Sequence, residues 1–366
     1  MPIKILMLIF LILAVVWGGN SASASNKPIL QKTDLPKLGT IPDGASLILA
    51  ALWSGEKDPK GNATKELYVI DDQGEQKTRI TYNGKAYHHF AVAPGRKMIA
   101  AIRYDEMMDI NNPANFRKKK TLWIIDLEGK KEWPLYPEID SGWGGVDWSP
   151  DGQWIYLSMF KDLAFDIYRL HPDGTDLTNI TKGIEMKLGA AQPGKWVTDT
   201  GASHDGKSII FLYTPKQGSG PFDFRKKCVI VTCGVDGSNP RILTDGGELP
   251  EGQYGVWVAG DYDPELSYDG KFFVFQRATG KAMNWNVTSH DIYLASIDGK
   301  ILRRLSPENN TAIQGIADWS EDGRIIFTEW NKKDMFMGPV MVNPDGSGYH
   351  RLEKANGGSE VRWIPK

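Results

Sequence analysis

The sequence contains few of the residues from which metal and redox sites are usually built. Its 366 residues include two cysteines and six histidines, and the histidines are scattered without metal-ligand spacing. Cys228 and Cys233 are five residues apart on one predicted strand, which places them roughly 16 Å apart and on opposite faces. They are therefore predicted to be buried free thiols. The Cys-x-x-Cys-His motif is also missing, so we expect no covalently attached haem on this chain.

An excess of charge of one sign is missing as well. Lysine and arginine total 43 against 45 aspartate and glutamate, which gives a net charge of -2. The composition therefore does not favour nucleic acid as a partner, and the basic runs Arg117–Lys120 and Arg225–Lys227 are short. A Gly-x-Ser-x-Gly motif is absent too, which excludes a peptidase of the prolyl-oligopeptidase type. We expect no catalytic centre from these patterns.

One apolar run stands out, close to the N-terminus. Ile5–Trp17 is an unbroken run of 13 apolar residues that follows Lys4, and Ala22-Ser23-Ala24 offers a cleavage site. This pattern predicts a signal peptide over residues 1–24 and an exported protein. The run is too short to cross a membrane, so we expect no membrane span. Residues 25–40 are then a short N-terminal extension, and residues 41–366 form one domain.

The main feature of the sequence is an internal repeat. One copy runs from Val146 to Thr181: a strand, a Ser-Pro-Asp-Gly turn, two further strands, a second Asp-Gly turn, and a short strand ending in threonine. Equivalent first turns are Pro42-Asp43-Gly44, Pro94-Gly95, His204-Asp205-Gly206, Tyr268-Asp269-Gly270 and Glu321-Asp322-Gly323. Glycine permits the positive φ of such hairpin turns. Six units can therefore be counted.

Each unit is predicted to be a four-stranded antiparallel sheet that cannot bury both faces alone. Stacking the units in a ring buries them, so the fold class is an all-β single β-propeller, with six blades counted and seven possible. Val361–Pro365 matches the first strand of a unit, Val146–Pro150, but stands alone at the C-terminus. We predict that it completes the first blade beside Leu47–Ala51 and closes the ring.

The Ser-Pro-Asp-Gly turn, the tyrosine-containing strand after it and the second Asp-Gly turn resemble the TolB-type propeller repeat over residues 40–366. These motifs specify the fold and say little about function. In whole-chain character, and in the long loop after Thr244, the sequence more closely resembles the β subunit of hydrazine synthase from anammox bacteria. The seven-bladed propeller of that family is the reason that seven blades stay possible.

The second resemblance implies an exported, haem-free propeller subunit located in the anammoxosome lumen. Its partners would be α and γ subunits that carry c-type haems, in a complex that condenses nitric oxide with ammonium to give hydrazine. One alternative is a TolB-like module that binds a protein in the periplasm. A second is a propeller-based, metal-dependent sugar lyase, which the scarcity of histidine disfavours.

The long connections are predicted to lie on one face of the ring, and one of them carries the candidate site. Long loops are costly to order and commonly have a function, so we expect the working face there. The segment 245–260 combines glycines with carboxylates and aromatics at Asp245, Glu248, Glu251, Tyr254 and Trp257. It is interpreted as a loop that inserts into a partner and modulates passage of an intermediate, or else as a surface excursion packed on its own aromatics. Ca²⁺ or Mg²⁺ could be bound by Glu251, Asp261 and Asp263.

Overall fold

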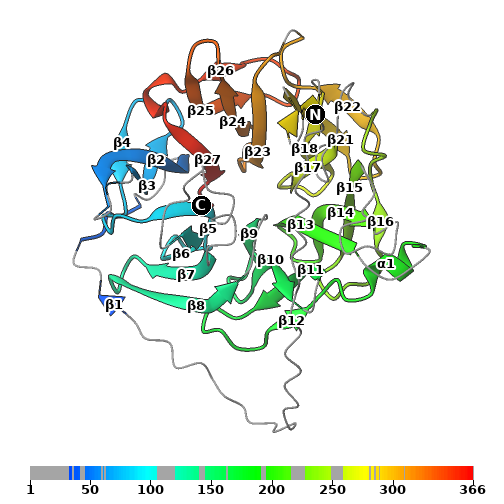
Figure 1. Cartoon of the computed structure of the whole chain (residues 1–366), viewed down its shortest axis with the longest axis horizontal. Coiled ribbons are helices and arrows are strands. Elements are labelled where there is room, and N and C mark those ends of the chain that lie inside the picture. The colour runs from blue at the N-terminus through cyan, green and yellow to red at the C-terminus, as the bar shows by residue number, and fades with distance from the viewer. Residues whose placement is uncertain are drawn as a thin grey trace, which may run out of the picture.

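The strands form six blades around a central axis, as Figure 1 shows. The computed structural model describes residues 33–34, 37–41, 46–58, 61, 63–104, 120–139, 145–161, 164–190, 195–215, 227–248, 259–279, 282–283, 286–287, 289–308 and 310–365. In this part of the chain every blade is a four-stranded antiparallel sheet. The predicted all-β propeller is confirmed, with six blades rather than seven. The predicted signal peptide, residues 1–24, lies outside the described residues.

Blades are numbered along the chain, and their strands are given from the axis outward. Blade one contains β27 (Gly358–Trp363), β2 (Leu47–Lys57), β3 (Ala63–Asp71) and β4 (Lys77–Arg79). Blade two contains β5 (Ala86–Val92), β6 (Met98–Tyr104), β7 (Lys120–Asp126) and β8 (Lys131–Ile139). Blade three contains β9 (Val146–Trp148), β10 (Ile155–Lys161), β11 (Ala164–Leu170) and β12 (Thr178–Asn179).

Blade four contains β13 (Lys195–Ala202), β14 (Ser208–Pro215), β15 (Lys227–Gly234) and β16 (Arg241–Ile242). Blade five contains β17 (Ala259–Leu266), β18 (Phe272–Ala278), β21 (His290–Ser296) and β22 (Ile301–Arg304). Blade six contains β23 (Ile313–Trp319), β24 (Ile325–Asn331), β25 (Phe336–Val342) and β26 (His350–Arg351). The remaining elements are β1 (Thr33–Asp34), which pairs with β8, the hairpin of β19 (Ala282–Met283) and β20 (Asn286–Val287), α1 (Ile184–Lys187) and a 3₁₀ turn (Glu353–Ala355).

The ring is closed by the C-terminal strand β27, as predicted. It pairs antiparallel with β2, placing Trp363 opposite Ile48 and Val361 opposite Ala50. The N-terminal part of the chain thus supplies three strands of blade one, and the C-terminus supplies the innermost strand. Joining the two ends in one sheet removes two open strand edges at once.

The Ser-x-Asp-Gly turns repeat one local hydrogen-bond pattern. In blade four the Ser203 hydroxyl donates to the Asp205 carboxylate at 2.7 Å, and the same serine oxygen accepts the backbone N–H of Ser208. Gly206 follows with φ +71°, which a side chain would strain. Blades three, five and six repeat this arrangement at Ser149, Ser267 and Ser320. The motif is therefore structural.

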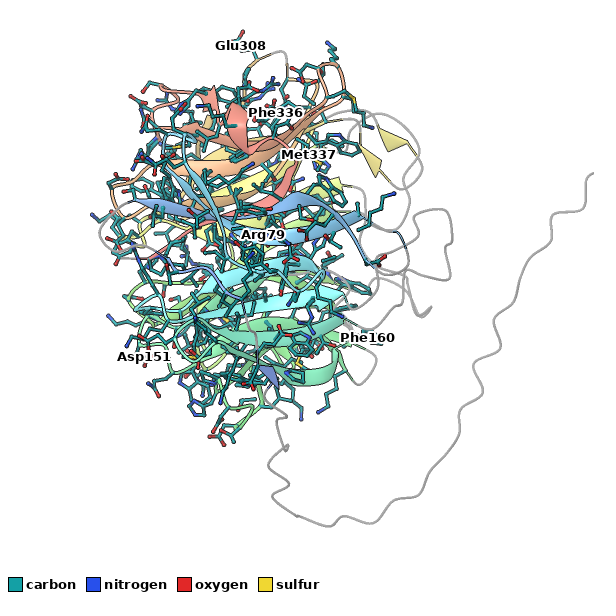
Figure 2. The ribbon with its side chains drawn as sticks, turned by 90° about the vertical axis from the view of Figure 1, so that its left-hand side faces the viewer. Arg79, Asp151, Phe160, Glu308, Phe336 and Met337 are labelled. Atoms are coloured by element: carbon teal, nitrogen blue, oxygen red, sulfur yellow. The ribbon has the colours of Figure 1, made fainter. Side chains whose placement is uncertain are left out.

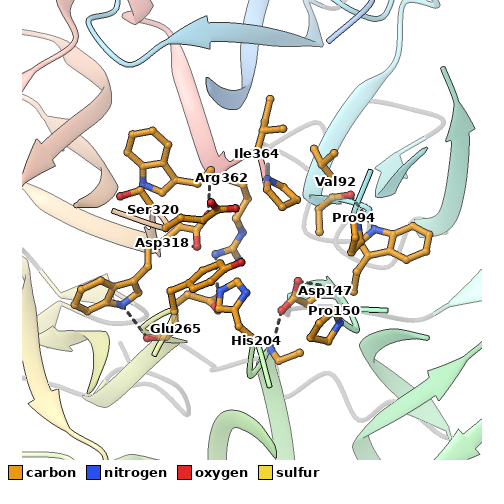
Figure 3. A pocket seen from close by; sticks show the side chains of 18 of the residues that line it. Val92, Pro94, Asp147, Pro150, His204, Glu265, Asp318, Ser320, Arg362 and Ile364 are labelled. Carbon is orange, nitrogen blue, oxygen red and sulfur yellow. Dashed lines mark hydrogen bonds and ion pairs between the residues drawn. The ribbon is translucent and has the colours of Figure 1, made fainter. Parts of the chain in front are cut away.

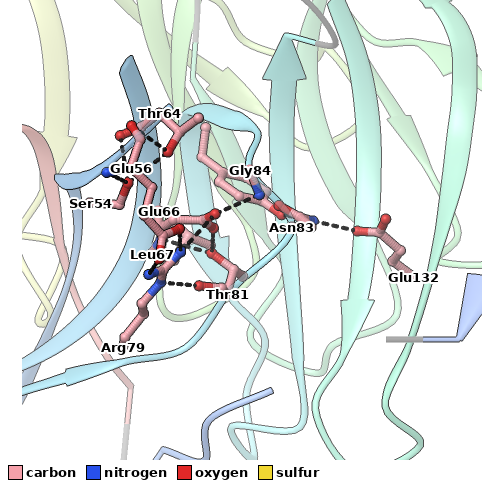
Figure 4. Close-up of polar contacts among 11 residues, drawn as sticks. Ser54, Glu56, Thr64, Glu66, Leu67, Arg79, Thr81, Asn83, Gly84 and Glu132 are labelled. Carbon is pink, nitrogen blue, oxygen red and sulfur yellow. Dashed lines mark hydrogen bonds and ion pairs between the residues drawn. The ribbon is translucent and has the colours of Figure 1, made fainter. Parts of the chain in front are cut away.

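The hydroxyl that ends the fourth strand also has a structural function. Thr81 accepts the backbone N–H of Leu67 at 2.9 Å and donates to the buried carboxylate of Glu66 (Figure 4). The same bond to a backbone N–H 14 residues earlier is made by Thr181, Thr244 and Ser306. These hydroxyls bond the end of the fourth strand to the third strand, at the point where the chain continues to the next blade.

The hydrophobic core is divided among the interfaces between blades. The buried apolar residues of the described chain form six clusters, one at each interface. The cluster between blades six and one includes Ile326 and Met341 from one side and Ile48 from the other. Cys228 and Cys233 are buried free thiols, as predicted, and burial raises the pKa of each to about 12. Among the described residues, we find no helix long and apolar enough to cross a membrane.

The propeller has two unlike faces. The face that carries the turns between first and second strands is called the short-turn face, and the face that carries the connections from second to third strands is called the long-loop face. Figure 2 shows Asp151, in a turn of blade three, on one side and Phe160, at the far end of β10, on the other. The candidate sites described below are located by the face on which they lie.

Candidate binding site at the propeller axis

One position of the repeat brings charged residues to a cavity at the axis. It lies two residues before the serine of the first turn, or its equivalent, on the innermost strand of each blade. Its occupants, called the axial ring, are Ala91, Asp147, Gly201, Glu265, Asp318 and Arg362. All except Gly201 line one cavity of about 110 Å³. Figure 3 shows that cavity with Arg362 among the carboxylates, and residues from all six blades contribute to its wall.

Two members of the axial ring join neighbouring blades. Asp318 accepts the backbone N–H of Trp319 in its own blade at 2.7 Å and that of Trp363 in blade one at 2.6 Å. Asp147 accepts from Trp148 and from Ala202 of blade four in the same way, at 2.8 and 2.7 Å. Burial raises the pKa of both carboxyl groups, that of Asp318 to about 6, although the backbone N–H groups oppose the effect.

Glu265 and Arg362 form the charged centre of the ring. Arg362 Nη1 lies 3.3 Å from Glu265 Oε2 and 3.2 Å from the carbonyl oxygen of Ala317. Burial opposes the charge of Arg362, but the surrounding carboxylates, Glu265 first, raise its pKa. Burial also raises the pKa of Glu265 well above its ordinary value, against the influence of Arg362. Gly201 makes room for this pair, since a Cβ there would lie 2.8 Å from Glu265 Oε1.

The rim of the cavity is aromatic. Tyr268 is 45% exposed, and its ring stacks on His204 with centroids 4.0 Å apart. Burial lowers the pKa of His204, which Asp147 partly offsets, so the imidazole is neutral at physiological pH. Trp148 and Trp319 are buried, and each indole N–H donates to a backbone carbonyl of the preceding blade. The rim therefore offers one exposed stacking surface above an acidic cavity.

A second layer of residues, mostly polar, lies two residues earlier on the same strands. His89, Asp199, Asp263 and Ile316 occupy this position, and all four have φ between +42° and +54°. Non-glycine residues seldom adopt that conformation, and here it coincides with a register shift in each strand pair. Glu360 holds the same position in blade one. Its carboxylate is fully buried and accepts the backbone N–H of His89 in blade two at 2.6 Å.

The carboxylates of the second layer differ in charge state. Burial raises the pKa of Asp199 well above its ordinary value, the nearby charge of Asp263 adds to this, and burial raises the pKa of Asp263 too. Burial acts in the same direction on Glu360, but His89, His88 and Arg362 outweigh it and lower the pKa of that carboxyl to about 2. The second layer therefore combines carboxyl groups whose pKa is raised, Asp199 and Asp263, with one whose pKa is lowered, Glu360.

The residues predicted as the partner loop are only partly described. Asp245 is exposed, and its Oδ1 accepts the N–H of Gly247 at 2.8 Å and lies 3.3 Å from Arg277 Nη2. Glu248 is exposed. Glu251, Tyr254 and Trp257 lie outside the described residues. The base of the segment is therefore anchored to blade five through Arg277, and the function predicted for it stays a prediction.

The residues predicted to bind Ca²⁺ or Mg²⁺ have separate partners. Asp261 is fully buried and bonded to Arg277 at 2.6 Å, whereas Asp263 belongs to the second axial layer. Within the described ranges, no group of three or more histidine, cysteine or acidic side chains could hold a metal ion. Glu251, the third predicted ligand, lies outside these ranges. The ion site stays a prediction without support from the residues that are described.

The axial cavity was not predicted from the sequence, although the aligned repeats contain a pattern that indicates it. Aligning the repeats places Asp147, Glu265, Asp318 and Arg362 in one column of the innermost strands. Charged residues at one repeat position of the innermost strands indicate that these side chains meet at the propeller axis. The cavity also opens among the short turns, at Pro94, Pro150 and Tyr268, and not on the long-loop face where function was expected.

The comparisons with known proteins support the fold. No protein-family model matches the sequence. An uncharacterised protein of Agrobacterium fabrum is 23% identical over 210 residues, which cover 57% of this chain and 60% of that protein. The match thus spans less than two thirds of the relative's length.

Among solved structures, TolB from Acinetobacter baumannii superposes with a TM-score of 0.60 at 16% identity, over 88% of this chain and 67% of that one. A putative TolB from Agrobacterium tumefaciens gives 0.53 at 16% identity, over 88% and 98%. A chain of a nidogen/laminin complex also gives 0.53, at 12% identity. The structural neighbours thus include TolB-type β-propellers, and at these identities the likeness establishes the fold alone. The resemblance to the hydrazine synthase β subunit receives no support from them.

Proposed function

We propose that this protein is an exported, TolB-like binding module that holds a partner protein at the short-turn mouth of its axis. The observation that carries the proposal is the cavity of about 110 Å³ to which all six blades contribute. The apolar run near the N-terminus supports export, and the periplasm is the compartment that we propose. The likeness to TolB-type propellers supports the class of protein.

The size of the cavity favours a protein partner over a small ligand. Pockets for drug-sized ligands and cofactors typically measure about 300–1,000 Å³. The axial cavity, at about 110 Å³, has room for roughly one side chain. A partner segment that inserts a single side chain, with flanking residues against Tyr268, fits this shape.

The charge of the cavity favours a lysine or arginine as the inserted side chain. The lining includes the carboxylates of Asp147, Glu265, Asp318, Glu321 and Asp322, and one arginine, Arg362. Because burial raises the pKa of Asp147, Glu265 and Asp318, an entering cation would displace protons from them. Binding should therefore strengthen as pH rises through about 6, the pKa of Asp318, and weaken with added salt.

Photocrosslinking in the native envelope tests the proposal. A photoreactive amino acid at position 268, on the short-turn face, should give a discrete adduct with one partner. The same amino acid at position 330, an exposed tryptophan on the long-loop face, is the matched control. Combining position 268 with Glu265→Gln should reduce the adduct several-fold. Equal adducts from both positions, or an adduct insensitive to Glu265→Gln and to salt, would show that the axial cavity is not the binding site.

The narrower proposal is a propeller subunit of hydrazine synthase, with haem-bearing α and γ partners and the 245–260 loop acting on an intermediate. It rests on the resemblance of the whole chain and of the loop after Thr244. Within the described residues, Arg277 contacts both Asp245 and Asp261 at the base of that loop. Purification from the native source separates the proposals. Co-purifying c-type haem proteins would support the narrower one, and an envelope protein without haem would contradict it.

A further inference from the structure

A lysine and a serine from opposite ends of the chain meet on the long-loop face of blade one. Lys65 Nζ donates a hydrogen bond to Ser359 Oγ at 2.8 Å, across a sequence separation of 294 residues. Lys65 lies on β3 opposite Trp53, and Ser359 lies on β27 next to the pairing of Gly358 with Leu52. The two side chains therefore meet beside Leu52 and Trp53 of β2, and neither Lys65 nor Ser359 lines the axial cavity.

The backbone around Ser359 fixes its position. Ser359 is the extra residue of a bulge, because Gly358 and Glu360 pair with consecutive residues of β2. Before it, Gly357 has φ +97°, donates its N–H to the carbonyl of Met337 at 2.7 Å and accepts the N–H of Trp53 at 3.3 Å. Gly358 packs so closely on Leu52 that a Cβ would lie 2.8 Å from its side chain. The serine thus projects from a segment held by blades six and one.

The surroundings of Lys65 favour its neutral form. Burial lowers the pKa of Lys65 to about 8, although the carboxylate of Glu360 acts in the opposite direction. A lysine that contacts a hydroxyl and titrates near pH 8 can accept a proton from that hydroxyl.

We propose that Ser359 and Lys65 form a serine–lysine dyad that transfers acyl groups from carboxylic esters. This activity goes beyond the proposed binding function and does not depend on it. The geometry is that of a nucleophile in hydrogen-bond contact with its base. The neighbouring indole of Trp53 is 40% exposed, and Lys65 Nζ lies 4.6 Å from the centroid of its ring. That indole offers an apolar surface for the acyl group.

The reaction balances with these two residues and water. Neutral Lys65 takes the proton of the Ser359 hydroxyl while Oγ bonds to the carbonyl carbon of the ester. The bond to the leaving alcohol then breaks, and that alcohol takes the proton from Lys65. Water hydrolyses the acyl-serine, with Lys65 carrying a proton from the water to Ser359 Oγ. An alcohol and a carboxylic acid leave, and the dyad is restored.

Labelling by a fluorophosphonate and hydrolysis of p-nitrophenyl acetate test the dyad in the full mature chain. We expect the label on Ser359, and a rate that rises with pH to a plateau through an apparent pKa near 8. Ser359→Ala should abolish the label. Lys65→Met and Lys65→Arg should each lower the labelling rate at least about tenfold, because general-base catalysis commonly contributes about 10²–10⁴-fold. Either lysine variant should also remove the inflection near pH 8.

Ser54→Ala is the matched control. Ser54 lies on β2 beside Trp53, and its hydroxyl contacts Thr64 at 2.6 Å (Figure 4), so its removal should leave labelling and hydrolysis unchanged. Melting temperatures of all variants report whether folding is intact. A label that is absent from the parent, stays after Ser359→Ala, or forms at the parental rate in both lysine variants would show that the contact is only structural, and the proposal would be wrong.

Discussion

The short-turn and long-loop faces of this propeller place their charged groups in different ways. On the axis, Asp147 and Asp318 at one repeat position, and Glu360 two residues before that position, each bond to the backbone of the next blade. On the long-loop face some contacts occur only once among the described residues, as in the pair of Lys65 with Ser359 and the bond from Arg277 to Asp261. The first kind of contact follows the symmetry of the ring, and the second departs from it.

Contacts that recur from blade to blade can thus be distinguished from contacts that occur once: the first are structural, and the second are candidates for a function. A contact that recurs at equivalent positions is explained by the need to join blades. Within the axial ring, Gly201, Glu265 and Arg362 depart from that pattern, so these three residues carry individual chemistry. Charged groups at the axis should therefore be costly to remove, and groups on the long-loop face should be removable with little loss of stability.

Deleting residues 360–366 should have the largest effect. The deletion removes most of β27 and with it Val361, Trp363 and Ile364, which are buried at 0%, 8% and 4% exposure. Truncating even one large core side chain costs about 2–5 kcal/mol, so losing three exceeds the stability of most domains. We expect aggregation, measured by size-exclusion chromatography. A monomeric truncation with unchanged melting would contradict closure by β27.

Glu360→Gln should have the next largest effect, with a defined pH dependence. The pKa of Glu360 is lowered in the folded protein from 4.5 to about 2, so its contribution is present above pH 4.5 and lost as pH falls to 2. We expect the variant to lose about 2–3 kcal/mol of unfolding free energy at pH 7. Denaturant titrations from pH 7 to pH 3 should show the difference from the parent shrinking.

Asp318→Asn is the contrasting control. Its folded-state pKa is raised from 3.8 to about 6, so this carboxyl stabilises the fold at low pH, and that contribution is lost as pH rises from 3.8 to 6. The stability of Asp318→Asn relative to the parent should therefore increase with pH over that window, opposite to Glu360→Gln. The same slope for both variants would contradict the charge states assigned to the axis.

Replacing residues 249–258 by a short Gly-Ser linker should have the smallest effect. The described anchors Asp245, Gly247 and Arg277 remain, and the blade strands are untouched. We expect the melting temperature to stay within a few degrees of the parent. A large loss of stability would show that this segment belongs to the fold, and changed turnover in an assembled complex would support the narrower proposal for its function.

Much of the fold could be predicted because its signals are local. The Ser-x-Asp-Gly turn folds through bonds between residues two to five positions apart, such as Ser203 to Asp205 and Ser208 to Ser203. The closing strand could be predicted because Val361–Pro365 matches the repeat. The blade count of six followed from the same repeats, and the possibility of seven came from the resemblance alone.

The sequence by itself determined six four-stranded units, their turns and the strand that closes the ring, because each depends on residues that are close together or repeated. Only the tertiary structure decided which residues meet. The axial ring gathers side chains from six blades, and Lys65 reaches Ser359 across 294 positions. Local sequence preferences specify neither the axial ring nor the contact of Lys65 with Ser359. Both depend on closure of the ring and on the bulges that bend the innermost strands.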